Sequence, residues 1–463
     1  MIGHPTLFAA GDCAVVDAKP RAPSGVWAVR AATPLARNLE AACAGRPLRG
    51  WRPQRQALQL LGGFRNGQPL AWAMRGKHLL GPSPWLWRWK TAIDARFMAM
   101  FRRSKSMDTS ETMACRGCAA KLPAGPLNMA LQQAGVTALG KDPEDAAALP
   151  LRSAAGSQPV LQSVDGFPAL VSDPWLNGRL TALHACSDLW ACGARVLSAQ
   201  AVVTLPEAND STQQTLLAQT LAGIRSALNE QGAELIGGHT LEARDGLAQP
   251  PLSRAVQVTL SVSGQPDRTF WPKAGLQEGD RLLLSRPLGT GVLFAAAMTG
   301  ASPPSALDTA LQQMSTSQHS LLEELLNLQI KYPDAIHAAT DITGFGLLGH
   351  ILEMAKGSKC RMSIDYNKTP IHPEAIALLK DGIRPGATAR NISFAESYLS
   401  HHESITHLEL QLLADPQTSG GLLFSVPKEI APQLCRELQK QGCLTSNIIG
   451  TVHAGDPSIY IHV

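Results

Sequence analysis

Beyond about residue 112, short segments rich in apolar residues predict a series of strands, which alternate with predicted helices. Five segments carry this pattern: Val160–Val164, Arg195–Val203, Ala255–Val262, Arg281–Ser285 and Arg361–Asp365. Apolar residues at steps of three or four predict amphipathic helices at Thr212–Gln231 and Thr316–Gln329. Strands and helices that follow one another in this way indicate an α/β or α+β fold.

Turn-forming and polar residues mark two breaks in the chain. The stretch Arg102–Ser110 predicts a linker, and the clusters Gly264–Asp267 and Gly275–Asp280 predict a domain boundary between about 265 and 280. We therefore expect three parts, which span residues 1–107, 112–270 and 271–463.

A basic amphipathic helix is predicted at Trp85–Phe101. Leu86, Trp89, Ile93, Phe97 and Met100 recur at helical spacing and share one face. We favour docking of this face on the segment's own domain, and contact with a membrane surface is the alternative. Nucleic acid is a weaker third alternative, because the basic residues are dispersed and no known reader motif accompanies them.

Charge divides the chain at the same place as the predicted linker. Residues 1–110 hold 17 Lys and Arg against 5 Asp and Glu, and six of the nine Trp, whereas the remainder holds 24 against 32. This break in charge and aromatic content indicates two units of different origin.

Composition places the 463-residue chain among ordinary globular proteins. Gly (40) and Pro (32) are too few for a collagen-like or disordered chain, and no apolar run approaches the roughly 18–20 residues that span a bilayer. The N-terminus lacks the features of a secretory signal, and the nine cysteines are scattered and odd in number. We expect a soluble, multi-domain cytoplasmic protein with reduced cysteines.

The motif Cys115-Arg116-Gly117-Cys118, with Lys121 beyond it, carries the first candidate chemistry. A zinc site needs two further ligands at suitable spacing, which the sequence lacks, and the usual strand-then-helix setting of a redox pair is not evident. A nucleophilic thiol whose thiolate is held by Arg116 and Lys121 is a third interpretation, and an incidental pair is the alternative.

A second candidate site consists of acidic residues at the ends of apolar segments. These are Asp145, Asp165, Asp188 and Asp341. Carboxylates at such positions are the hard oxygen ligands that Mg²⁺ prefers, although each one alone is more often a cap or turn residue.

A third candidate site consists of four glycine-rich segments. They are Gly237–Thr240, Gly289–Gly291, Gly344–Gly349 and Thr418–Gly421. As loops they could hold phosphates with backbone N–H groups, or they could be simple turns. Gly344–Gly349 also matches the G-x-G-x-x-G dinucleotide fingerprint, but Asp341 precedes it where phosphates would approach, which favours a metal-bridged phosphate over NAD. No Walker A, Gly-x-Ser-x-Gly or His-Glu-x-x-His motif occurs.

From about residue 112 onward these motifs, in this order, resemble the selenophosphate synthetase (selenide, water dikinase) family of the aminoimidazole ribonucleotide synthetase-like superfamily. The matching stretches are Cys115–Lys121, Glu144–Leu149, Ser163–Asp165, Ser187–Gly193, Gly237–Thr240, Arg286–Leu293, Thr340–Met354 and Asp415–Gly421. The resemblance implies two α/β domains paired in a homodimer. It also implies conversion of ATP, selenide and water to selenophosphate, AMP and phosphate, which supplies selenium for selenocysteine and selenouridine.

The resemblance also implies roles for individual residues. Cys118 matches the catalytic cysteine or selenocysteine, and Lys121 the essential lysine, which also contacts ATP. The implied Mg²⁺ ligands are Asp145, Asp188 and Asp341, and the implied ATP contacts are Lys121, Glu144, Asp165, Asp188, Gly237, Gly238 and His239. K⁺ is a further candidate ion, and no nucleic-acid partner is implied. His184 departs from the family, which often has Asn there, and leaves the local hydrogen bonding open.

Residues 1–107 resemble the C-terminal end of an FAD-dependent NADH dehydrogenase-like protein. Thr6–Cys13 looks like its late flavin motif, but the earlier G-x-G-x-x-G domains for FAD and NADH are missing, so we expect a remnant without a functional flavin site. The rival functions are a purine or thiamine kinase or ligase of the same superfamily, an FAD- or NADH-dependent oxidoreductase, and a scaffold at a membrane surface.

Overall fold

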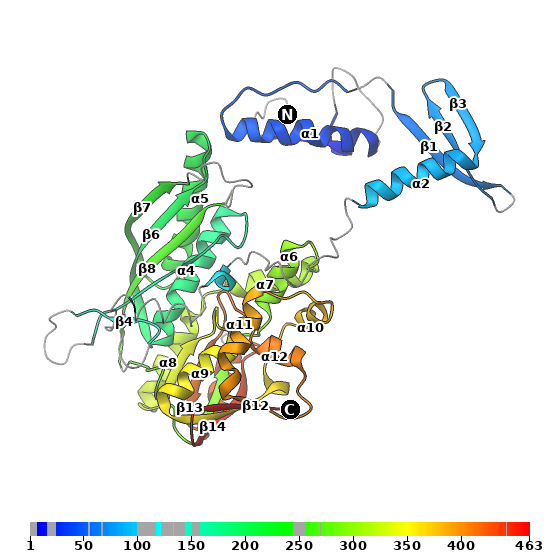
Figure 1. Ribbon diagram of the computed structural model, residues 1–463. Coiled ribbons are helices and arrows are strands. Elements are labelled where there is room, and N and C mark those ends of the chain that lie inside the picture. Colours follow the sequence, from blue (N-terminus) through cyan, green and yellow to red (C-terminus); the bar gives the residue numbers. More distant parts are fainter. Residues whose placement is uncertain are drawn as a thin grey trace. The chain divides into compact units, whose positions relative to one another are not determined.

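A computed structural model shows how these segments fold (Figure 1). It describes residues 7–15, 25–53, 56–65, 68–99, 117–121, 133, 144–150, 158–243, 255–268, 270–440 and 442–463. The predicted linker and Cys115 lie outside these residues. The chain divides into two compact units, Met1–Glu111 with Glu207–Thr212, and Thr112–Pro206 with Gln213–Val463.

The described residues of the first unit form a three-stranded antiparallel meander and two α-helices. The elements are η1 (Gly11–Cys13), α1 (Gly25–Cys43), β1 (Leu58–Arg65), β2 (Gln68–Arg75), β3 (His78–Ser83) and α2 (Pro84–Ala99). The predicted helix at 85–101 is therefore confirmed as α2. Its Leu86 is buried against Ala71 and Ala73 of β2, whereas Trp89 and Ile93 of the same predicted face are exposed. The helix docks on its own sheet through its first turn.

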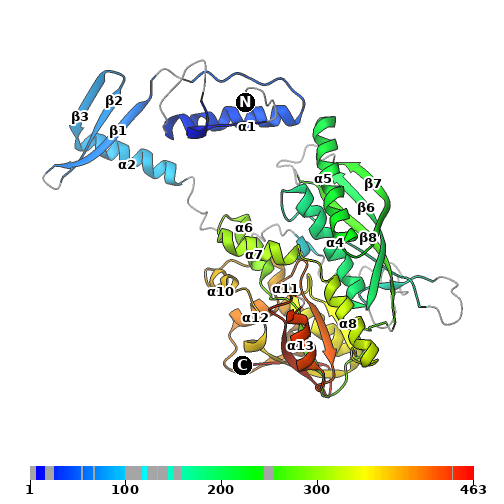
Figure 2. The same ribbon diagram turned by 180° about the vertical axis from the view of Figure 1, so that it is seen from behind.

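The second unit begins with a five-stranded sheet. Its strands are β4 (Ala147–Ala148), β5 (Leu161–Phe167), β6 (Ala194–Leu205), β7 (Glu234–Glu242) and β8 (Gln257–Pro266). Their order is β4-β5-β8-β6-β7, with only β6 and β7 parallel. Helices α4 (Pro174–Ala191) and α5 (Asp210–Asn229) lie on one face of this sheet, and no helix of the second unit's described residues covers the other (Figures 1 and 2).

A seven-stranded sheet follows, in the order β10-β13-β9-β14-β11-β15-β12. Its strands are β9 (Arg281–Leu284), β10 (Ala338–Asp341), β11 (Cys360–Asp365), β12 (Leu399–His401), β13 (Leu422–Val426), β14 (Asn447–Ala454) and β15 (Ser458–His462). The remaining elements are η2 (Gly117–Ala120), α6 (Thr290–Met298), α7 (Pro304–Met314), α8 (His319–Lys331), α9 (Gly346–Ser358), η3 (Tyr366–Lys368), α10 (Pro373–Lys380), α11 (Gly386–Ala395), η4 (Glu396–Tyr398), α12 (His407–Leu413) and α13 (Ala431–Lys440). The α/β expectation is confirmed.

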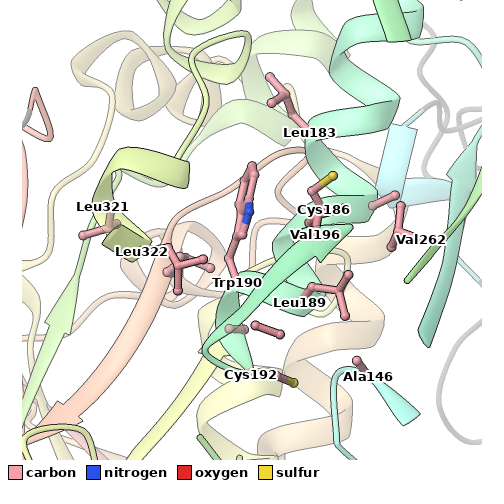
Figure 3. Close-up of a cluster of buried hydrophobic side chains, with 14 of the residues drawn as sticks. Ala146, Leu183, Cys186, Leu189, Trp190, Cys192, Val196, Val262, Leu321 and Leu322 are labelled. Carbon is pink, nitrogen blue, oxygen red and sulfur yellow. The ribbon is translucent and has the colours of Figure 1, made fainter. Parts of the chain in front are cut away.

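Helix α4 is buried between the two sheets. Asp173 caps its N-terminus by accepting a hydrogen bond from the Leu176 N–H, Pro174 occupies its first turn, and Gly193 follows its end with φ +70°. Its Leu189 packs toward β6 and β8, and its Trp190 toward Leu321 and Leu322 of α8 (Figure 3). Because the helix is buried on nearly all sides, packing fixes the positions of the polar side chains that it carries.

The alternation of side chains along β9 shows that the seven-stranded sheet is covered on both faces. Leu283 belongs to the core that includes α4, α8 and α13, whereas Leu282 and Leu284 belong to the core formed with α9 and α12. Successive side chains of β9 therefore point into two different cores, as expected of a sheet that is buried on both faces.

The structure corrects one expectation about the glycine-rich segments and supports the preference for a metal-bridged phosphate over NAD. Gly237–Thr240 is not a loop but part of edge strand β7, and a Cβ on Gly238 would lie 2.0 Å from the Ala201 carbonyl oxygen of β6. Close approach of the two strands thus accounts for this glycine. The G-x-G-x-x-G segment connects β10 to α9, but the sheet neighbour of β10 is the antiparallel strand β13. This pairing contradicts the NAD interpretation, which requires a parallel βαβ unit.

Asp415 joins the loop before β13 to the start of α6. Its Oδ2 accepts hydrogen bonds from the Gly291 N–H (2.9 Å) and the Gln417 amide (2.9 Å), whereas its buried Oδ1 has no hydrogen-bond partner. Burial raises the pKa of Asp415 to about 7, although the hydrogen bonds from Gln417, Val292 and Gly291 oppose that rise. A proton on the carboxyl group therefore favours the folded chain.

We predict a pH-dependent stability effect for Asp415→Asn. Since the folded-state pKa lies above the ordinary 3.8, the stability contributed by Asp415 is fully present below about pH 4 and is lost as pH rises through 7. Relative to wild type, the variant should gain about 2–4 kcal/mol in free energy of unfolding between pH 4 and pH 8, measured by urea denaturation. The exposed Asp308→Asn serves as control. A difference from wild type that is constant with pH would contradict this prediction.

Candidate active site at a buried carboxylate cluster

Three carboxylates from distant parts of the sequence meet in the second unit. Asp145 precedes β4, Asp188 lies in the last turns of α4, and Asp341 ends β10. One carboxylate oxygen of each lies within 4.8 Å of those of the other two. We call this group the carboxylate cluster; it contains the three residues expected to bind Mg²⁺.

Hydroxyl groups on neighbouring elements orient the three carboxylates. The Ser163 hydroxyl of β5 donates a hydrogen bond to Asp188, and Ser187 of α4 donates to Asp341 over 2.5 Å. Thr340 donates to Asp145 over 3.3 Å. Hydrogen bonds from strand and helix residues fix the direction in which the ligand oxygens point.

Mutual repulsion and burial make this cluster electrostatically costly. Burial and, after it, the charges of Asp341, Asp165 and Asp145 raise the pKa of Asp188 well above its ordinary value. Burial and the charge of Asp145 raise the pKa of Asp341 to about 6, against opposing effects of His184, Ser187 and Lys121. Three nearby acidic groups therefore require positive charge to be ionised together.

Lys273 supplies part of that charge. It is buried, and its Nζ lies 2.5 Å from Asp145 Oδ1 and 3.2 Å from Glu353 Oε2. Its backbone N–H donates to Glu144 Oε2 over 2.8 Å. Although burial opposes it, the charges of Asp145 and Glu353 raise the pKa of Lys273, so its ammonium group stays protonated. Glu144, expected to contact ATP, thus holds the backbone of this lysine.

Asp165 forms a separate pair with His184 beside the cluster. His184 Nε2 lies 3.0 Å from Asp165 Oδ2, while His184 Nδ1 accepts a hydrogen bond from the Ser419 N–H over 3.3 Å. Burial would raise the pKa of Asp165, but His184, Lys121 and the Gly166 N–H outweigh it and lower that pKa to about 2. His184, the residue that departs from the family pattern, therefore helps to keep Asp165 ionised.

Residues Gly117–Lys121, the described part of the Cys115–Lys121 stretch, also lie at this site. The Lys121 ammonium group lies 5.2 Å above the centre of the Phe345 ring, and its charge lowers the pKa of both Asp165 and Asp341. Cys118 lies in the short helix η2, and the position of its side chain is outside what the structure describes. Gly117 has φ +60°, and a Cβ there would lie 2.6 Å from Thr418 Oγ1, so glycine lets η2 approach the Thr418 loop.

The expected ATP contacts on β7 lie apart from the cluster within one chain. Gly237, Gly238 and His239 belong to the edge strand, and strands β6 and β8 separate them from Asp165 on β5. At roughly 4.8 Å per strand, three strand spacings put them on the order of 14 Å from β5. The structure therefore brings together Lys121, Glu144, Asp165 and the carboxylate cluster but not these three residues.

Oxygen donors of this kind fit a hard divalent cation. Three carboxylates whose oxygens approach within 4.8 Å suit Mg²⁺ or Mn²⁺ rather than a soft metal. Sequence reasoning missed Lys273 and Glu353, which complete the charge balance of the site. Lys273 stands in no recognisable motif, and Glu353, although it lies within the matching stretch Thr340–Met354, is 80 residues from Lys273 in the sequence.

Family models and curated proteins match most of the second unit. The family model for the N-terminal domain of AIR synthase related proteins matches residues 143–263, and that for the C-terminal domain matches residues 277–462. A curated "Selenide, water dikinase" from Myxococcus xanthus is 35% identical over 367 residues, which cover 78% of this chain and 99% of that protein. A protein of the same name from Pelobacter propionicus is 32% identical over 351 residues, covering 74% and 94%.

Solved structures agree with the fold. Thiamine monophosphate kinase from Aquifex aeolicus is similar, with a TM-score of 0.50 and 17% identity over 73% of this chain and 96% of that one. A chain of the HypE–HypF complex has a TM-score of 0.51 and 18% identity, covering 72% and 96%. At this identity the likeness concerns the fold alone.

We predict that Lys273→Met strengthens metal binding while it destabilises the metal-free protein. Removing the ammonium group leaves Asp145 and Glu353 without their counter-charge, so a divalent cation should bind about tenfold more tightly. Mn²⁺ titration by calorimetry without nucleotide measures the affinity, and thermal unfolding in chelator measures the stability. Lys331→Met removes the same charge from an exposed position and should change neither. Weaker Mn²⁺ binding by Lys273→Met would show instead that the lysine supports the metal site.

Proposed function

The chain belongs to the selenide, water dikinase family, and on that premise we propose how its residues convert ATP, selenide and water to selenophosphate, AMP and orthophosphate. The observation that carries the proposal is the carboxylate cluster with Lys121 beside it. Phosphoryl transfer depends mainly on positioning and on neutralising charge, and this site offers oriented acids together with cationic side chains.

Asp145, Asp188 and Asp341 are proposed to hold Mg²⁺. When bound, the ions neutralise the phosphate charges of ATP and connect them to carboxylates that would otherwise repel them. Ser163 and Ser187 keep Asp188 and Asp341 in a fixed orientation through their hydrogen bonds. Asp165, held ionised by His184 and Lys121, is available to accept hydrogen bonds from the nucleotide.

Lys121 and Cys118 are proposed to bind the selenium anion. The Lys121 ammonium group is anchored over Phe345 beside Asp165 and Asp341, where it can attract a small anion such as hydrogen selenide. Cys118 lies three residues earlier on the same segment, whose 3-10 helix is seated through Gly117 against Thr418. Closing this segment over the selenium anion would exclude water from it.

A homodimer is proposed through the open face of the five-stranded sheet. Val164 of β5, Leu197 and Val202 of β6, and Ile236 and Leu241 of β7 are all exposed, from 42% to 65%. An apolar sheet face of this kind is typical of a protein–protein interface, and a second copy would cover it. The same contact would bring Gly237–His239 of one chain near the partner chain.

We also propose that the protein acts in the cytoplasm. The seven cysteines whose side chains the structure describes form no disulfide, which suits a reducing compartment that contains ATP. Among the described residues, no helix combines the length and apolarity needed to cross a bilayer.

The catalytic proposal is tested by product formation under anaerobic conditions. Wild-type protein with ATP, Mg²⁺ and selenide should form AMP and selenophosphate, followed by ³¹P NMR. Cys118→Ser, Lys121→Ala and Asp188→Asn should each lower kcat/KM by about 100-fold or more, because each removes a charge or a ligand at the reacting groups. Cys13→Ser and Asp308→Asn change the same residue types at exposed positions and should stay near wild type. If wild type releases no AMP in response to selenide, the proposed activity is wrong.

The dimer is tested by light scattering after size exclusion. Wild type should have twice the 49.3 kDa mass of one chain, and Val202→Asp should be monomeric because it places a charge in the apolar face. Ile330→Asp alters an exposed residue of α8, outside this face, and should leave the dimer intact. A wild-type monomer, or a dimer that tolerates Val202→Asp, would contradict the proposed interface.

A further inference from the structure

A cavity of about 500 Å³ lies in the C-terminal half of the second unit, and none of the roles proposed above involves it. Four segments form its walls: the residues after β9, the end of α7 with the start of α8, the residues before α10, and the residues after α13. Neither the carboxylate cluster nor Asp165 lines it. Small organic ligands commonly occupy cavities of roughly 300–1,000 Å³, so this one has the size of a ligand site.

Charge within the cavity points to an anion. Arg286 lines it and is buried, and no Asp, Glu or Lys does. The Arg286 guanidinium donates hydrogen bonds to the carbonyl oxygens of Ser419 (3.0 Å) and Thr316 (2.5 Å), but it forms no ion pair within the described residues. Burial lowers the pKa of Arg286 to about 10, which still leaves it charged at neutral pH. A buried guanidinium with carbonyl partners alone is costly unless an anion joins it.

Neutral donors surround this cation. Ser320 is the second residue of α8, so it lies at the positive end of a 13-residue helix. The hydroxyl groups of Ser320 and Thr445 and the side-chain amide of Gln312 line the open side of the cavity; these three residues are exposed and form no hydrogen bond through these groups in the part of the chain that the structure describes. The buried His372 Nε2 likewise has none. Guanidinium, hydroxyl groups and a helix N-terminus together are the usual partners of a phosphate group.

Apolar residues form a second part of the wall, among them Pro287, Ile371 and Leu444, and further Ser, Thr and Gln residues complete it. Inorganic phosphate would leave these residues uncovered and most of the roughly 500 Å³ unfilled. A phosphate attached to an apolar or planar organic group would fill both parts of the cavity.

We propose that this cavity is a second ligand site, which binds a small organic phosphate ester with its phosphate at Arg286 and Ser320 and its organic part against Ile371 and Leu444. The site is separate from the carboxylate cluster and does not depend on the selenium chemistry proposed above. Its ligand is held by charge and shape, without a covalent step.

The test is calorimetric titration of the full chain with phenyl phosphate, an aromatic phosphate ester. An unreactive ATP analogue with Mg²⁺ first saturates the nucleotide site. Wild type should bind phenyl phosphate, and Ser320→Asp should weaken binding at least about tenfold because it adds a negative charge at the rim. Ser305→Asp makes the same change at the same position of helix α7, outside the cavity, and should bind within about twofold of wild type.

Both aspartates suit the first turn of a helix, so these two variants should fold. Arg286→Gln should lose binding, with thermal unfolding recorded alongside because Arg286 is buried. Absence of phenyl phosphate binding in the millimolar range, or equal binding by Ser320→Asp and Ser305→Asp, would overturn the proposal. If inorganic phosphate binds as tightly as phenyl phosphate, the proposal that the cavity recognises an organic group is wrong. If benzoate binds as tightly, the proposal that the cavity recognises a phosphate group is wrong.

Discussion

The structure depends on holding three carboxylates together where one, Asp341, is buried and the other two are partly buried. Asp145, Asp188 and Asp341 repel one another, and burial strengthens that repulsion. The fold opposes it with hydroxyl donors on three of the carboxylate oxygens and with the ammonium group of Lys273 on Asp145. The remaining negative charge is the property that a nucleotide-binding site using divalent cations requires.

The two sheets and α4 make this arrangement possible. On the same buried helix, Asp188 accepts a hydrogen bond from Ser163 of β5, and Ser187 donates one to Asp341 of β10, so each sheet contributes one neighbour to the site. Four of the matching stretches, Glu144–Leu149, Ser163–Asp165, Ser187–Gly193 and Thr340–Met354, supply the residues of this junction. A change in the packing of α4 would displace acids on both sides at once.

Sequence reasoning succeeded where the signal was local. Short apolar segments predicted β5, β6 and β8, and the resemblance carried by the ordered motifs predicted that the three acids share one site. It failed where long-range contacts decide. Leu422–Val426 is buried at every position, so β13 has no alternation to recognise. Gly237–Thr240 suggested a loop because its pairing with β6 cannot be read from neighbours in sequence, and Lys273 meets Asp145 only across 128 residues.

The burial of α4 has a consequence for how substrates enter and products leave. Many two-lobed ATP-using enzymes open by rotating one lobe about a hinge. Here one helix packs into the cores beneath both sheets, so rotating one half against the other would tear apart a continuous apolar interior. We therefore expect access to the site to depend on local displacement of short segments such as Gly117–Lys121, whose Lys121 is exposed, rather than on rotation of one lobe against the other.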